Sequence, residues 1–407
     1  MLRLSLLTLG VALAAIGCAP SQSGTKGDAG PGFDANPGDS GGVTVLTSDP
    51  VGRFALGGTH TCWLARGGGI YCWGSNNRGQ LGDGTETGRA APLRVLAIRT
   101  AEYLSGKSAQ NCAQIHGGQV QCWGSNSHGQ LGGATATEFR TSPVGVLSVD
   151  DGGSVAVGAL HACAVRGAGA VWCWGNNLSG TLGRGTEGSP EKPGVVTNGT
   201  GAQAVTAGSS FNCLLSTGGT VSCWGKNTNA QLGDGTTTDR LEPVAVVGLP
   251  GSVKAVTAGD AHACALTMDG NVYCWGSNKY GQVGSGSASD ANISTPTAVM
   301  GIAGDAVAID AGSQTTCALR TNGNLACWGS NASKQLGDVV DESRASAADV
   351  TGMSGVEFFG VGTSHVCAAT NTSVFCWGSN SQGQLAIDGD EDVHPTPTLV
   401  SLPEDPL

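Results

Sequence analysis

Residues 72–85 read CWGSNNRGQLGDGT, and this stretch contains two short signatures that recur along the chain. The first, Cys-Trp-Gly, returns at spacings of 50, 51, 50, 51, 53 and 49 residues, its cysteines being Cys72, Cys122, Cys173, Cys223, Cys274, Cys327 and Cys376. Near-equal spacing of this kind indicates seven copies of one supersecondary unit. A repeat architecture is therefore expected.

The second signature, Gly-Gln-Leu-Gly, begins seven residues after each triplet cysteine in close variants. Its copies are residues 79–82, 129–132, 180–183, 230–233, 281–284, 334–337 and 383–386. Each unit reads as four short strands separated by glycine and asparagine turns. In the fifth unit the predicted strands are 253–258, 262–267, 272–276 and 295–299. A single four-stranded sheet exposes two apolar faces, so the units are expected to cover one another in a ring.

Composition favours an all-β chain and excludes several classes of protein. Glycine supplies 68 of 407 residues and charged residues only 13%, whereas helices are weakened by glycine and gain from i,i+4 ion pairs. A hydrophobic content of 40% excludes global disorder. The net charge is -11 and no cluster of Lys or Arg occurs, so a nucleic-acid partner is not expected.

The Cys-Trp-Gly triplet, the Gly-Gln-Leu-Gly turn, the Asp-Gly-Thr loops at Asp83 and Asp234 and the period near 50 residues together resemble the regulator of chromosome condensation repeat. The resemblance covers residues 51–403 and implies an all-β fold, a seven-bladed β-propeller of four-stranded antiparallel blades. The founding member of that family is a nucleotide-exchange factor for a nuclear GTPase. The even repeat spacing leaves little room here for the hairpin wedge on which that exchange depends.

The fifteen cysteines divide into seven pairs and one remainder, Cys18. The pairs are Cys62 with Cys72, Cys112 with Cys122, Cys163 with Cys173, Cys213 with Cys223, Cys264 with Cys274, Cys317 with Cys327 and Cys367 with Cys376. A hairpin centred near Gly67 and Gly68 would place the first pair directly opposite each other, within disulfide reach. Disulfides local to each blade are favoured over buried thiols and over a zinc site, for which the C-x-x-C spacing is missing.

Residues 1–17 are predicted to be the signal peptide of a lipoprotein. Arg3 precedes an apolar run that is too short for a stable membrane anchor. The run ends in small residues before Cys18, a segment that resembles a bacterial lipoprotein processing box, and Cys18 is the expected lipidation site. An ordinary signal peptide cut nearby, which would leave Cys18 as a free thiol, is the alternative.

Residues 18–50 are rich in Gly, Pro, Ser and Asp and are predicted to tether the propeller domain at 51–403 to the membrane. By resemblance, Ala19 after the lipidated cysteine favours an outer-membrane address in the bacterial cell envelope. Residues 43–46 resemble the fourth strand of each unit. They are expected to lie beside the last unit, either pairing with it or displacing residues 395–400, and so to close the ring.

Aromatic and histidine residues at repeated positions pose a choice between binding and packing. The triplet tryptophans are expected to pack between blades, whereas Trp63 and Trp172 lie outside that position and are the better candidates for exposed contacts. Four histidines stand two residues before the first cysteine of units one, three, five and seven: His60, His161, His262 and His365. A structural hydrogen bond is expected for each, because alternate blades hold equivalent positions too far apart for a shared metal.

The acidic run Asp388, Asp390, Glu391 and Asp392 is expected to be a solvated loop, with calcium binding left open. No metalloprotease, P-loop or dinucleotide motif occurs, and no catalytic residue, cofactor or metal is predicted. The leading hypothesis is a monomeric, non-enzymatic envelope lipoprotein whose propeller binds a protein or glycan. Exchange-factor-like regulation of a small GTPase is the alternative. A hydrolase or lyase activity has only scattered carboxylates in its favour.

Overall fold

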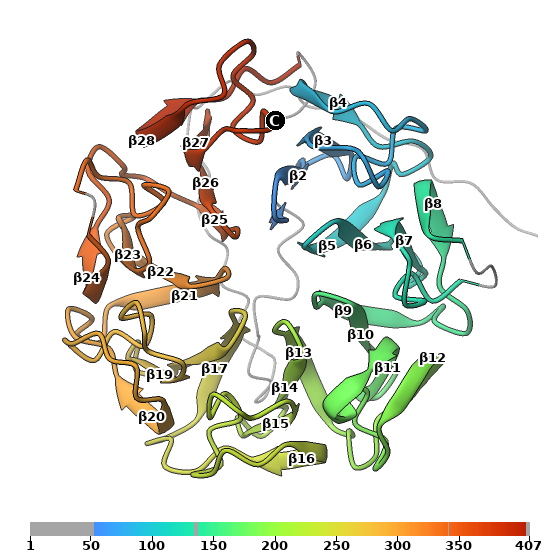
Figure 1. Ribbon diagram of the computed structural model, residues 1–407, viewed down its shortest axis with the longest axis vertical. Coiled ribbons are helices and arrows are strands. Elements are labelled where there is room, and N and C mark those ends of the chain that lie inside the picture. The colour runs from blue at the N-terminus through green and yellow to red at the C-terminus, as the bar shows by residue number, and fades with distance from the viewer. Residues whose placement is uncertain (1–52, 134–136, 341, 404–407) are drawn as a thin grey trace, which may run out of the picture. The chain divides into compact units, whose positions relative to one another are not determined.

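A computed structural model describes residues 53–133, 137–340 and 342–403 of the chain. Every strand in these ranges belongs to one of seven four-stranded antiparallel sheets, which follow one another around a ring (Figure 1). The predicted seven-bladed β-propeller is confirmed. No helix among the described residues is both long and apolar enough to cross a membrane.

Each blade is built from four strands that are consecutive in the chain. Blade 1 contains β1 (Arg53–Leu56), β2 (His60–Leu64), β3 (Ile70–Gly74) and β4 (Arg89–Arg94), and blade 2 contains β5 (Ala101–Lys107), β6 (Gln110–Ile115), β7 (Val120–Ser125) and β8 (Phe139–Gly145). Blade 3 contains β9 (Gly152–Val157), β10 (His161–Arg166), β11 (Ala170–Asn177) and β12 (Gly188–Val195), with a 3-10 turn, η1 (Leu178–Gly180), between the last two.

The later blades repeat this plan. Blade 4 contains β13 (Ala202–Ala207), β14 (Phe211–Ser216), β15 (Val221–Gly225) and β16 (Arg240–Ala245), and blade 5 contains β17 (Val253–Ala258), β18 (His262–Thr267), β19 (Val272–Gly276) and β20 (Ile293–Ala298). Blade 6 contains β21 (Ala306–Ala311), β22 (Thr315–Arg320), β23 (Leu325–Gly329) and β24 (Arg344–Asp349), and blade 7 contains β25 (Phe358–Val361), β26 (His365–Ala369), β27 (Val374–Ser379) and β28 (Val393–Leu399).

The four strands of blade 5 can be compared one by one with the strands predicted from the sequence. The first three lie where they were predicted, as β17, β18 and β19. The fourth, predicted at 295–299, is Ile293–Ala298 instead. Its pairing with β19 shifts register between Cys274 and Gly276, and the extra residue of such a bulge interrupts the regular alternation from which a strand end is predicted.

The apolar core lies between blades rather than inside them. One buried cluster joins Cys62, Leu64 and Leu81 of blade 1 to Leu104 and Trp123 of blade 2, and equivalent clusters join the other neighbours. The second strand of blade 1, β2, is accordingly buried at every position, whereas its fourth strand, β4, carries only half-buried and exposed residues. A blade is therefore stable only against its neighbours.

Ring closure does not use an exchanged strand among the described residues. The fourth strand of blade 7, β28, pairs with β27 of the same repeat, so the predicted displacement of residues 395–400 is wrong. The joint is closed by packing of Leu56 and Trp73 of blade 1 against blade 7, where Trp73 Nε1 donates to the Gln384 carbonyl at 2.9 Å. Residues 43–46 lie outside the described ranges.

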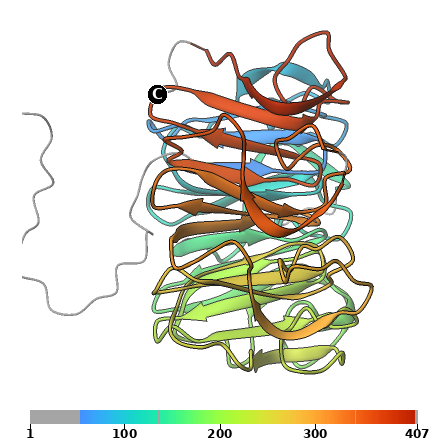
Figure 2. The ribbon, with the colours of Figure 1, turned by 90° about the vertical axis from the view of Figure 1, so that its left-hand side faces the viewer.

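The propeller has two faces that differ in their connections (Figure 2). Because consecutive strands are antiparallel, the turns after first strands and the loops after third strands share one face. We call this the long-loop face, since it carries the Gly-Gln-Leu-Gly turns. The turns after second strands and the links between blades form the short-turn face. The two ends of the central channel open on these faces.

Candidate functional site

All seven predicted disulfides are present, one in each blade. In each, the two cysteines face each other on the second and third strands, with Cα atoms 4.1 Å apart for Cys62 and Cys72. The paired cysteines are fully buried. Fourteen of fifteen cysteines are thereby used, and Cys18 lies outside the described residues.

The two sequence signatures meet across every blade interface. The indole Nε1 of each triplet tryptophan donates to the backbone carbonyl of the second residue in the previous blade's Gly-Gln-Leu-Gly turn, at 2.9 to 3.0 Å: Trp73 to Gln384, Trp123 to Gln80, Trp174 to Gln130, Trp224 to Thr181, Trp275 to Gln231, Trp328 to Gln282 and Trp377 to Gln335. These tryptophans are fully buried, so the packing role predicted for them is confirmed.

The last glycine of the turn is required by this contact. Gly183 has φ +67, and a Cβ there would lie 2.7 Å from Trp224 Nε1 and 2.8 Å from a Val196 methyl carbon. A larger residue would be strained in this conformation and would also displace the indole. The turn and the tryptophan therefore form one inter-blade joint.

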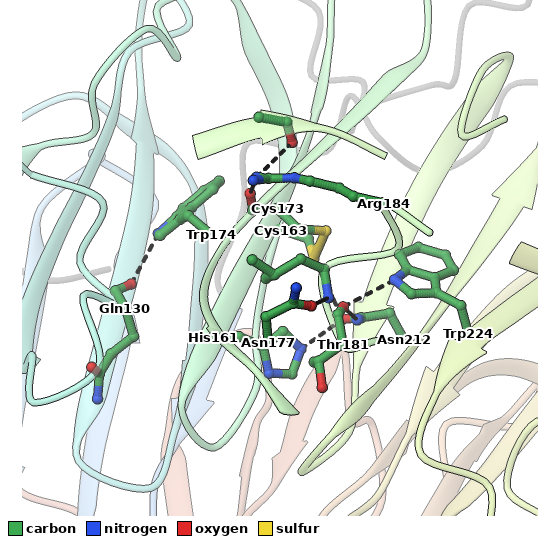
Figure 3. The surroundings of a disulfide bond; sticks show 12 residues. Gln130, His161, Cys163, Cys173, Trp174, Asn177, Thr181, Arg184, Asn212 and Trp224 are labelled. Atoms are coloured by element: carbon green, nitrogen blue, oxygen red, sulfur yellow. Dashed lines mark hydrogen bonds between the residues drawn. A yellow bond between two sulfur atoms is a disulfide. The ribbon is translucent and has the colours of Figure 1, made fainter. Parts of the chain in front are cut away.

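The four predicted histidines make the second type of inter-blade contact. Each imidazole Nε2 meets a polar side chain that stands one residue before the first cysteine of the next blade: His60 with Asn111, His161 with Asn212, His262 with Thr316 and His365 with Thr61. Figure 3 shows His161 against Asn212, whose Nδ2 donates to the Thr181 carbonyl at 2.8 Å. The predicted structural hydrogen bond is confirmed.

The other three interfaces lack both members of this pair. Where the preceding blade has Gln110, Phe211 or Thr315 in place of histidine, the next blade has a buried Ala162, Ala263 or Val366. Gln110 Nε2 instead donates to the backbone carbonyl of His161 at 3.0 Å. Histidine in one blade and a polar residue in the next thus occur together.

Burial keeps these imidazoles neutral. It lowers the pKa of His60 and His161 to about 4 and that of His262 and His365 to about 3. Each side chain is at most 1% exposed. A neutral imidazole that donates from Nε2 suits an amide or hydroxyl oxygen, whereas a second proton on a buried Nδ1 would need an acceptor.

The tryptophans outside the repeated position behave differently from each other. Trp63 is 1% exposed and packs near Tyr71, with ring centroids 6.2 Å apart, so the prediction of an exposed contact is wrong for it. Its strand, β2, lies between two neighbouring blades, with Trp63 packed toward blade 7 and Cys62 and Leu64 packed toward blade 2. Trp172 is half-buried beneath the Arg166 guanidinium, 4.5 Å from its ring centroid.

On the long-loop face, the carboxylates of Asp83, Asp234 and Asp390 each pair with a basic side chain of the same blade and do not form a cluster. Asp83 pairs with Arg89 at 2.8 Å and Asp234 with Arg240 at 2.8 Å. In the acidic run, Asp390 contacts His394 at 3.1 Å. No group of three or more metal-ligating side chains occurs among the described residues, which include this run.

A cavity of about 420 Å³ lies in the central channel. First strands of all seven blades line it, and its wall is mostly Ala, Val, Leu and Phe. Near the long-loop face, Lys107 of blade 2 reaches blade 5, with Nζ 3.4 Å from the Ala258 carbonyl and 3.4 Å from Asp260 Oδ1. This contact joins blades that are not neighbours in the ring.

The wall of the central channel also contains the carboxyl group of Asp310. Its Oδ2 accepts a bond from Val361 N at 2.8 Å and its Oδ1 one from Thr257 Oγ1 at 3.3 Å, which link three first strands. Burial raises the pKa of Asp310 to about 6. Sequence reasoning missed these channel residues. The available signal was a charged residue inside a first strand of otherwise small or apolar residues.

Models of one known repeat family match most of the chain. Residues 119–406 match the RCC1-like domain, and residues 67–119 and 53–80 match the Regulator of chromosome condensation (RCC1) repeat. The chain belongs to the RCC1 repeat family.

Curated relatives match the propeller and not their full length. The chain is 30% identical over 317 residues to human E3 ubiquitin-protein ligase HERC2, which is 74% of this chain and 6% of that protein. It is 30% identical over 307 residues to the Ultraviolet-B receptor UVR8 of Arabidopsis thaliana, 72% of this chain and 68% of the receptor.

Solved structures show the same fold at lower identity. Human WBSCR16 superposes with a TM-score of 0.74 at 22% identity, covering 83% of this chain and 96% of that one. Prp20p of Saccharomyces cerevisiae, described with its binding to Gsp1p and histones, superposes with a TM-score of 0.71 at 21% identity, covering 82% and 86%. These likenesses concern the fold alone.

Proposed function

We propose that this chain is a non-enzymatic lipoprotein of the bacterial cell envelope whose propeller binds a protein partner. The observation that carries the proposal is the division of the cysteines. Fourteen of the fifteen cysteines form seven disulfides, one in each blade. The remaining cysteine, Cys18, stands in the segment that resembles a lipoprotein processing box. Disulfides persist in oxidising compartments, outside the reducing cytosol.

A protein partner is supported by similar structures. Prp20p was described with its binding to Gsp1p and histones, and yeast RCC1 was solved bound to Kap60. Propellers of this kind present two broad faces made of turns and loops, and loops on a rigid scaffold are common binding elements. Leu178, at 62% exposure, and Met268, at 54%, are apolar side chains exposed in such connections.

The alternative function, nucleotide exchange on a small GTPase, is supported by membership of the RCC1 repeat family. A chain held outside the cytoplasm would not meet a cytosolic GTPase. A measurement of nucleotide release from a small GTPase, with and without the purified chain, separates the two. Stimulated release together with a cytosolic, unprocessed chain would replace the scaffold proposal.

The anchor is tested in a bacterial host by palmitate labelling and membrane fractionation of the wild type, Cys18→Ser and the control Ser21→Ala. Cys18→Ser is expected to lose the label and to leave the membrane fraction, because the acyl chains supply the apolar area that holds the protein in lipid. The control should behave as wild type. Equal labelling of Cys18→Ser and wild type would contradict the proposal.

The partner class is tested by cross-linking the anchored protein in intact envelopes. The captured species is then treated with protease or with periodate. Peptides of a second protein in the protease digest of the cross-linked band support a protein partner. A band that yields peptides of this chain alone and shifts after periodate treatment would assign the propeller to glycan binding.

A further inference from the structure

The central channel carries a small excess of positive charge, although the protein as a whole is acidic. The chain has 20 basic and 31 acidic residues, yet Arg53, Lys107 and Lys254 all line the channel. Lys107 is paired with Asp260. Arg53 lies over the Tyr103 ring, 3.9 Å from its centroid, and Lys254 Nζ donates to the Val307 carbonyl at 3.3 Å. Within the described ranges neither Arg53 nor Lys254 has a carboxylate partner.

Strand register places these two cations at one end of the channel. Arg53 lies two residues before Ala55, which pairs with Cys62, and Lys254 lies three residues before Thr257, which pairs with Cys264. Both therefore stand toward the start of a first strand, at the short-turn face. Lys107 lies two residues after the corresponding Ser105 and stands toward the opposite end.

The two carboxylates of the channel wall, Glu357 and Asp310, do not neutralise Arg53 and Lys254 at the short-turn end. Glu357 is held by Arg66 at 2.6 Å, which neutralises it. Asp310 lies level with the cysteine ring, since it pairs with Cys317, and is therefore deeper than Lys254. Its two bonds to Val361 and Thr257 fix it in the wall. Counting Lys107 with Asp260 and Glu357 with Arg66 as neutral pairs, the lining keeps two positive charges against one negative charge.

The rest of the cavity suits an organic body rather than an inorganic ion. Phe54, Val155, Val256 and Phe359 are among the wall residues, and the volume of about 420 Å³ lies within the range of small-molecule sites. Ser154 also lines the cavity and is 8% exposed, and its hydroxyl has no hydrogen-bond partner among the described residues. That hydroxyl is itself almost wholly covered, so recognition of a charged group in this cavity rests on Arg53 and Lys254.

We infer that the channel binds a small organic anion, which enters from the short-turn face with its anionic group between Arg53 and Lys254 and its apolar body against the strands of the wall. The inference does not depend on the proposed protein partner, since the channel wall and the outer loops use different residues. It assigns a ligand class to a cavity whose chemistry differs from that of the surface around it.

Two probes that differ only in charge test the inference. 8-Anilinonaphthalene-1-sulfonate carries a sulfonate, and N-phenyl-1-naphthylamine is the same aromatic body without it. We expect saturable binding of one sulfonate probe per chain by fluorescence titration of the full-length protein, at least about tenfold tighter than binding of the neutral probe, because an anion paired with a half-buried cation gains a charge-assisted bond.

Variants locate the binding. The double variant Arg53→Met, Lys254→Met keeps the apolar stems and is expected to weaken binding of the sulfonate probe by about tenfold or more while changing the neutral probe less than about twofold. Lys279→Met, at an exposed position on the long-loop face, is the matched control and should bind both probes as wild type does. Near-UV circular dichroism checks that each variant retains native packing.

Three results would overturn the inference. They are equal affinity of the wild type for both probes, sulfonate binding that the double variant leaves unchanged, and absence of saturable binding of either probe. If the double variant loses native circular dichroism, the single variant Lys254→Gln, which keeps a polar donor for the Val307 carbonyl, takes its place with the same two expectations.

Discussion

The seven blade interfaces share one bond and differ in another. At each of them a tryptophan donates to a turn carbonyl of the previous blade. Four interfaces add a buried histidine with an amide or hydroxyl partner, and three place Ala162, Ala263 or Val366 there instead. The shared bond is part of the repeated fold, while the variable position accepts either a polar pair bonded through the imidazole Nε2 or an apolar contact.

Within this chain the two facing positions differ together from one interface to the next. A buried imidazole without a partner would cost more than either pair does, because desolvation is then not compensated. Histidine occurs in blades 1, 3, 5 and 7, so two histidine blades adjoin in a ring of odd number. Thr61 of blade 1 therefore accepts from His365 while His60 of the same blade uses Asn111.

The largest expected effect is acid sensitivity of the wild type. Because the folded-state pKa values of the four histidines are lowered to about 4 or 3 from 6.5, the unfolded chain binds more protons below pH 6.5. Their contribution to stability is complete above pH 6.5 and falls as the pH drops toward 4. Asp310, with a pKa raised to about 6, binds its proton first in the folded state and offsets part of this loss.

We expect the free energy of unfolding to fall by about 5 kcal/mol between pH 7 and pH 5, since each histidine contributes at most about 1.4 kcal/mol per pH unit. Urea unfolding at several pH values, followed by tryptophan fluorescence, measures it. A stability that stays constant over this range would show that the imidazoles are protonated in the folded protein.

Substitution of the shared tryptophan should separate the two kinds of interface. In Trp275→Phe the Gln231 carbonyl loses its indole donor, whereas in Trp224→Phe the Thr181 carbonyl keeps the Asn212 amide. We expect destabilisation of about 3 kcal/mol for Trp275→Phe and about 2 kcal/mol for Trp224→Phe, from the shared volume loss and the unequal loss of donors. Urea midpoints in the reverse order would refute the distinction.

A smaller effect is expected from the hydroxyl partners. Thr316→Val removes the group that His262 Nε2 contacts at 2.8 Å and should cost about 2 kcal/mol. The reciprocal change at a histidine-free interface, Val366→Thr, is the control and should cost less, about 1 kcal/mol, because the new hydroxyl can donate to the Gln335 turn carbonyl as Thr316 does to that of Gln282, and no imidazole depends on it. Similar losses for both variants would mean that packing, not the hydrogen bond, decides this position.

Converting one interface into the other kind should have the smallest effect. The double variant His161→Phe, Asn212→Ala copies the Phe211 and Ala263 pair, and replacing both polar partners can be nearly neutral. We expect stability within about 1 kcal/mol of the wild type at pH 7 and an acid-induced loss reduced by about one quarter. Each single change serves as the control, and additive losses from the two would contradict pairing.

Local signals were strong enough to predict the blades. The recurrence of Cys72 and its six equivalents, with cysteines nine or ten residues upstream, predicted the hairpins and the disulfides, because a hairpin brings residues close in sequence into register. The same signals failed for Trp63, which stands beside a paired cysteine but is covered by another blade. Its burial depends on what packs against the strand.

The sequence by itself determined the number of blades, their strands and the cysteine pairing, since each of these follows from patterns within about 50 residues. Only the tertiary structure decided which side chains meet across blades. His161 and Asn212 lie 51 residues apart, and Lys107 and Asp260 lie in blades that are not neighbours. Arg53 and Lys254 share one end of the channel for the same reason: closure of the ring, which no local pattern encodes, brings the first strands of all blades together.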